Sequence, residues 1–162
     1  MNINDLVCSL ELAKKLKELG VKQKSNIYWM EIIDPFLVPI LTEHDKLLFF
    51  HITHNILPPH VYSAFTSSEL GEILPKAISI ITDEEDKKMF CNFRFVTGRS
   101  LIIEEENPIE FWSVNYICDT TNEFRNWLFD ALLTKAIYDK NEANARAKIL
   151  IYLLENGLIK NG

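Results

Sequence analysis

The stretch EANARAKILIYLLENGLI, residues 142–159, contains an unbroken apolar run from Ile149 to Leu154. A helix that is apolar nearly all round is normally buried in a protein core. Asp139 or Asn141 stands just before this stretch and can cap the N-terminus of such a helix. We therefore expect a buried C-terminal helix around which the rest of the chain packs.

A second helix is expected in SLELAKKLKELGV (9–21), where Ser9 suits the N-cap position and leucines recur at helical spacing. The lysines at 14, 15 and 17 fall mostly off this leucine stripe, so we expect them in solvent. The helix ends in Leu19-Gly20-Val21, and the C-terminal helix ends in the similar Asn156-Gly157-Leu158. Gly20 and Gly157 are both predicted to have positive φ, the conformation that commonly closes a helix.

The lysine-rich N-terminal helix could be half of a DNA-reading helix-turn-helix. That motif needs a second helix three or four residues after the turn. The next segment, NIYWMEII (26–33), is instead rich in β-forming residues. The net charge of −6, from 17 basic and 23 acidic residues, also argues against nucleic acid as a partner, because phosphate binding needs clustered Lys and Arg. A DNA-binding regulator that uses the lysines around 14–24 stays an alternative.

The middle of the chain is predicted to be mostly β. TGRS (97–100) fits a hairpin turn between two of the strands, and TSSELGEILPKAI (66–78) opens with the Thr66/Glu69 capping box of a short helix that Pro75 should end. A further helix is expected over 124–135, and 78–82 fits either a strand or more helix. The expected strands are 26–33, 36–41 (at an edge, because of Pro39), 46–53, 89–96, 101–105 and 110–117.

These elements predict an α+β fold in a single domain, 1–162, with an antiparallel sheet packed by an N-terminal helix and two C-terminal helices. The length of 162 residues and the 48% hydrophobic content are sufficient for one substantial core. The residues expected in that core, packed onto Phe93 and Phe95, are Leu12, Leu16, Trp127, Leu128, Ala131, Leu150 and Leu154.

The cellular setting is predicted to be cytoplasmic, in a bacterium or a bacterial host cell. The three cysteines, Cys8, Cys91 and Cys118, form no CxxC pair, which favours a reducing compartment. The N-terminus has no basic and apolar signal-peptide regions. The 22 residues from Leu47 to Ser68 lack Asp, Glu, Lys and Arg, but they are too polar and proline-rich for a membrane helix. We expect no membrane partner.

The segment HITHNILPPH (51–60) has the most catalytic character, because histidine is the usual metal ligand and general base. On a strand, His51 and His54 would point to opposite faces, so we expect divergent imidazoles, no metal and no catalytic residues. The acidic runs 83–86 and 104–106 are expected to be solvated turns. With no nucleotide, zinc-protease or hydrolase motif in the chain, we expect no cofactor and a function other than catalysis. A small metal-assisted hydrolase using His51, His54 and His60 stays an alternative.

The uncharged stretch also suggests a contact surface, because interface cores are poor in charge. The predicted interaction loop consists of His51, His54, Ile56, His60 and Tyr62.

Three segments resemble small proteins of unassigned activity encoded by bacteriophages and prophages: LVCSLELAKKLKELGVKQKSNIYW (6–29), YSAFTSSELGEILP (62–75) and NARAKILIYLLENGLI (144–159). The resemblance implies a phage origin and a bacterial cytoplasmic setting, and it assigns no catalytic residue. We therefore predict a phage- or prophage-type accessory protein that binds a host or phage protein without catalysis, a host-defence inhibitor being one version. Its oligomeric state is left open.

Overall fold

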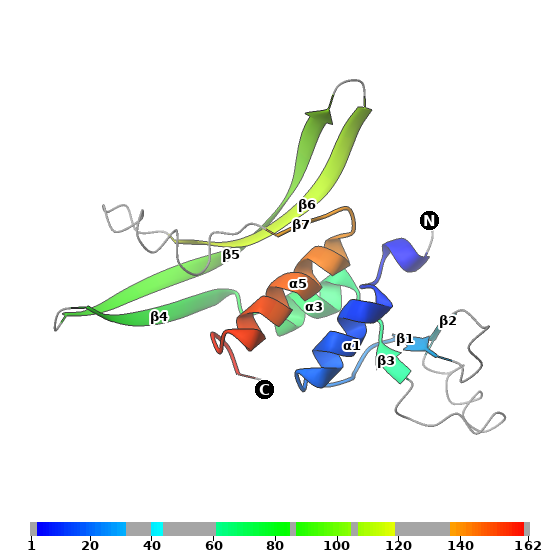
Figure 1. The fold of residues 1–162 in the computed structure, drawn as a ribbon, viewed down its shortest axis with the longest axis horizontal. Helices are drawn as coiled ribbons and strands as arrows, with labels where there is room; N and C mark the ends of the chain where they lie inside the picture. Colours follow the sequence, from blue (N-terminus) through cyan, green and yellow to red (C-terminus); the bar gives the residue numbers. More distant parts are fainter. Residues whose placement is uncertain are drawn as a thin grey trace.

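The computed structural model describes residues 3–31, 40–43, 61–84, 87–104, 107–118 and 137–160 (Figure 1). The α+β class is confirmed, and both terminal helices are present. The helix expected over 124–135, with the core residues Trp127, Leu128 and Ala131, and the strand expected over 46–53 lie outside the described residues. The elements in chain order are η1 (Ile3–Asp5), α1 (Leu10–Glu18), β1 (Ile27–Met30), β2 (Ile40–Glu43), β3 (Val61–Ser63), α3 (Ser67–Ile73), β4 (Ala77–Glu84), β5 (Lys87–Glu104), β6 (Asn107–Cys118), β7 (Ile137–Asp139) and α5 (Glu142–Glu155).

Side-chain caps begin the helices where the sequence predicted. The Ser9 hydroxyl accepts a hydrogen bond from the Leu12 N–H at the start of α1. At α5 the cap is Asn141, one of the two residues expected. The capping box of α3 is complete, with Thr66 and Glu69 each bonding to the other's backbone N–H. Each cap satisfies a backbone donor that the helix itself leaves unpaired.

Glycines end α1 and α5 in the same way. Gly20 has φ of 81° and Gly157 has φ of 65°, which confirms the prediction for both. The residue after each glycine donates its N–H to a carbonyl five residues earlier, Val21 to Leu16 and Leu158 to Leu153, each at 2.9 Å. Both ends are therefore Schellman caps, in which backbone groups satisfy the last carbonyls of the helix.

The described strands form two antiparallel sheets, whereas the sequence predicted one. The smaller has the order β2-β1-β3, and the larger has the order β4-β5-β6-β7. The expected turn at 97–100 is wrong, because β5 runs unbroken from Lys87 to Glu104. Gly98 lies in mid-strand opposite Ser113, whose hydroxyl donates to the Gly98 carbonyl at 3.2 Å. The pairing of β5 with β6 instead continues to Glu104↔Asn107. Segment 78–82 is strand, within β4.

α5 lies among α1, α3, β6 and β7 and supplies much of the core (Figure 1). The core prediction is confirmed for Leu16 and Leu150, which are 0% and 1% exposed. Leu12, Leu154 and Phe95 are half-buried against the same core. The buried residues of α5 are Ala143, Ala145, Ala147, Ile149, Leu150, Ile151 and Leu153. The helix is thus covered on most of its sides, as its apolar run predicted.

The guanidinium of Arg146 on α5 packs against Gly71 of α3. A Cβ at Gly71 would collide with the guanidinium of Arg146, which occupies that space. Arg146 pairs with Glu142 at 2.6 Å and lies 5.6 Å from the ring centroid of Phe95. Gly71 weakens α3 as an isolated helix, but it provides the room that lets this arginine reach the sheet.

Candidate functional site

The predicted interaction loop is only partly within the described residues. His51, His54, Ile56 and His60 lie outside them, as does His44, so whether the imidazoles diverge stays a prediction. Tyr62 lies in β3 and is half-buried. Its ring centroid is 4.8 Å from the amine of Lys17 and 5.5 Å from the amine of Lys14. Burial, aided by the nearby charge of Glu31, raises the pKa of the Tyr62 hydroxyl.

The described end of the uncharged stretch packs in the core. Ser63, Ala64 and Phe65, which join β3 to α3, are fully buried. Charged side chains are excluded there because burying an unpaired charge is costly. Absence of charge in this part of the stretch therefore reflects the core and gives no support to a contact surface.

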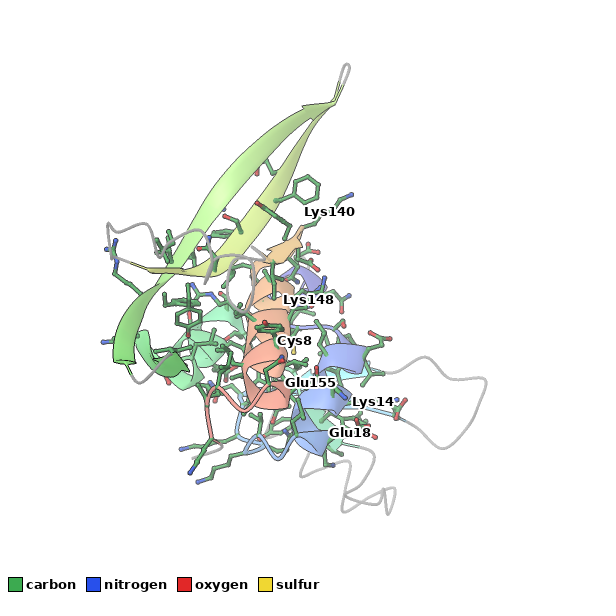
Figure 2. The ribbon with its side chains drawn as sticks, turned by 60° about the vertical axis from the view of Figure 1, so that its left-hand side comes forward. Cys8, Lys14, Glu18, Lys140, Lys148 and Glu155 are labelled. Atoms are coloured by element: carbon green, nitrogen blue, oxygen red, sulfur yellow. The ribbon has the colours of Figure 1, made fainter. Side chains whose placement is uncertain are left out.

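The lysines of α1 are partly exposed, and each also contacts a neighbouring element. Lys14 pairs with Glu31 at 2.6 Å, and Lys15 pairs with Glu155 of α5 at 2.9 Å. Lys17 donates to the Val61 carbonyl at 3.0 Å. Figure 2 labels Lys14 and Glu18 on α1 and Glu155 on α5. The residues after Gly20 lead into β1, so this segment has no helix-turn-helix geometry.

A cavity of about 780 Å³ opens where α1 and α5 end, beside α3. We name it the lysine groove, because Lys22, Lys24 and Lys160 all line it. Its apolar residues include Val21 and Leu150, which are buried, and Ile73 at the end of α3, which is 40% exposed. Cavities of this size commonly hold small molecules. The lysine groove is therefore a candidate site for a small molecule.

Glu69 organises one wall of the lysine groove. Its carboxylate accepts hydrogen bonds from the Ser25 hydroxyl at 3.0 Å, from the Asn26 N–H at 3.1 Å and from the Thr66 N–H at 2.8 Å. The Thr66 hydroxyl also donates to it, at 3.0 Å. This carboxylate connects the start of α3 to the α1–β1 connection, so its oxygens are already occupied by the fold.

The outer part of the β5–β6 hairpin is a second candidate. β4 pairs with β5 only up to Arg94, and β7 pairs with β6 only over Trp112–Val114. The register pairs from Ser100↔Phe111 to Glu104↔Asn107 therefore have no third strand in the described part of the chain. We name residues 100–104 and 107–111 the distal ribbon. Figure 1 shows it projecting away from the helices.

The thiol of Cys8 is enclosed in the core. Cys8 is fully buried, and burial raises the pKa of its thiol to about 12, so it stays protonated at neutral pH. This fits the expectation that it acts as a small apolar residue. Within the ranges that the structure describes, no three His, Cys, Asp or Glu side chains are grouped as metal ligands would be.

No helix in the described ranges is long and apolar enough to span a membrane. No protein-family model, curated protein or solved structure matches this chain.

Proposed function

We propose that the protein is a non-enzymatic, phage- or prophage-type accessory module that binds a host or phage protein. The observation that supports this proposal is the distal ribbon, which has no third strand beside it in the described part of the chain. A two-stranded ribbon is at best marginally stable by itself in water. Its outer edges carry backbone N–H and C=O groups that can pair with a strand of another chain.

The sequence of the distal ribbon also suits a contact surface. Leu101, Ile102, Ile103, Ile109 and Phe111 give it a high apolar content for a segment that projects from the body. Long apolar edges are an aggregation hazard unless they are covered, and a partner chain would cover this one. The glutamates at 104 and 110 favour a partner with basic residues beside the strand it adds.

A shortened hairpin tests the proposal. Ser100 and Phe111 are directly paired, so residues 101–110 can be replaced by Asn-Gly, a two-residue turn that suits a hairpin. Among the residues that this replacement removes, those that the structure describes pair only with one another. The melting temperature of the remaining protein should therefore stay the same. Affinity capture from a bacterial host lysate, read by mass spectrometry, should lose the partner. Binding of that partner, once purified, should be lost as well.

The interaction loop can be tested in the same capture assay. Ile56→Glu should weaken capture if the loop is a second contact, whereas replacing His51 and His54 together by Ala should reduce capture modestly or leave it unchanged. Stoichiometric zinc in the purified protein, lost in the His51/His54 variant, would support the hydrolase alternative instead. Full capture by the shortened hairpin would refute the distal ribbon as the binding element.

A further inference from the structure

We propose that the lysine groove binds a small organic anion with an aliphatic or aromatic body, such as a medium-chain carboxylate. Its apolar part would lie on the floor of the groove, and its negative end would lie among Lys22, Lys24 and Lys160. This inference is independent of the distal ribbon and of the protein partner proposed above.

The charge of the lysine groove favours an anion. Lys22, Lys24 and Lys160 are exposed, and none of them forms an ion pair with another described residue. Two carboxylates also line the groove, but Glu69 already accepts the hydrogen bonds of Ser25, Asn26 and Thr66. The three lysines and the two glutamates leave the lining of the groove with one net positive charge, and Glu72 is the carboxylate without these hydrogen bonds. An added negative group would improve this balance.

The two helix ends beside the groove need no lysine to cap them. The C-terminus of a helix carries a partial negative charge, which a nearby cation can offset. At α1 and α5, however, the Schellman hydrogen bonds of Val21 and Leu158 already satisfy the terminal carbonyls. The three amines thus remain available to a ligand.

The floor of the lysine groove favours an apolar ligand body. Val21, Tyr28 and Leu150 form its buried part, and Leu154 and Ile159 are half-buried beside them. Ile73 leaves 40% of its surface uncovered although it lies next to this floor. A ligand that covers aliphatic surface gains roughly 25 cal/mol for each Å² that it removes from water. An inorganic anion would leave this surface exposed, so the groove suits an anion that carries hydrocarbon.

Titration with 1-anilinonaphthalene-8-sulfonate tests the proposal directly, because this fluorescent probe joins an aromatic body to a sulfonate. N-phenyl-1-naphthylamine serves as its uncharged counterpart. The combined Lys22→Gln, Lys24→Gln and Lys160→Gln variant should bind the sulfonate about tenfold more weakly, since an exposed ion pair is worth roughly a factor of two. Its affinity for the uncharged probe should not change. Decanoate should displace the sulfonate, and decanol should do so less well.

A control variant removes one positive charge outside the groove. Lys140 is also exposed, but it lies at the opposite end of α5 from Glu155 and from the groove (Figure 2). Lys140→Gln should keep full affinity for the sulfonate. Near-ultraviolet circular dichroism would verify that each variant is folded, because loosely packed states also bind this probe.

A second pair of variants keeps the test decisive if the triple variant fails to fold. Ile73→Glu places a negative charge in the lining of the groove and should abolish sulfonate binding. Ile3→Glu changes a residue of nearly equal exposure, 39%, outside the groove and should not affect it. The inference is overturned by the absence of sulfonate binding, by equal loss in both isoleucine variants, or by an unchanged affinity in the folded triple variant.

Discussion

Leu150 and Leu153 lie one helical turn apart on α5 and offer a direct test of how the core and the lysine groove meet. Both are almost fully buried, at 1% and 0% exposed. Leu150 lines the groove, whereas Leu153 is not among the residues that border it. Truncation of either to Ala removes three carbons, but the space left behind differs between the two sites.

The transfer contribution should be similar for both variants, at about 0.8 kcal/mol for each buried carbon, or about 2.4 kcal/mol. The cavity contribution should differ. At Leu150 the new space merges with the groove, so water can enter it and the loss should stay near 2–3 kcal/mol. At Leu153 the space is enclosed, so the loss should approach 4 kcal/mol, roughly the upper part of the range for such substitutions.

Urea unfolding followed by far-ultraviolet circular dichroism would measure both losses by linear extrapolation. The slope against denaturant should be unchanged, since both variants keep the same fold. An equal loss at the two sites, or a larger loss at Leu150, would refute the argument that the groove reaches the core at Leu150. A loss at Leu150 of less than about 0.5 kcal/mol would mean that α5 is peripheral.

Three further substitutions follow from local geometry. Gly157→Ala should lower the free energy of unfolding by about 1 kcal/mol, measured by urea unfolding, because φ is positive there and no neighbour contacts the new methyl. Ser63→Ala should leave thermal stability unchanged or raise it by up to about 1 kcal/mol, because the buried Ser63 hydroxyl has no hydrogen-bond partner among the described residues. A lower stability in Ser63→Ala would show that the hydroxyl forms a stabilising hydrogen bond. Asp139 concerns pH: burial acts to raise its pKa, but the hydrogen bonds from Lys148 and the Asn141 N–H outweigh burial and hold the pKa below 3.8. The ionised carboxylate therefore stabilises the fold fully above pH 3.8, and this stabilisation is lost as the pH falls through the lower pKa of the folded state. In Asp139→Asn, the free energy of unfolding should decrease less between about pH 5 and pH 2 than in the unchanged protein.

The ends of the helices could be predicted because their determinants are local. Ser9, Asn141 and the Thr66/Glu69 pair each bond to a backbone group within three residues. The glycines at 20 and 157 need only a conformation that other residues rarely adopt. Such preferences depend little on the rest of the fold, so the sequence predicted them correctly.

The interaction loop was predicted from the absence of charged residues in its part of the sequence. A stretch without charged residues can be buried within the protein or covered by a partner, and the sequence looks the same in both cases. At Ser63, Ala64 and Phe65 the structure shows the first. Nothing in the sequence could have pointed to the lysine groove, because Lys22, Glu69, Leu150 and Lys160 meet there from segments far apart in the chain.

The sequence by itself determined the α+β class, the caps of α1, α3 and α5, and the burial of α5, because apolar periodicity and capping act over a few residues. The tertiary structure alone decided the course of β5 through Thr97-Gly98-Arg99-Ser100. These residues have turn propensity, but each is paired with a residue of β6, and Arg99 lies 4.7 Å from the ring centroid of Trp112. Pairing over the length of β6 outweighs a weak local preference for a turn, and strand register depends on contacts that no short window of sequence contains.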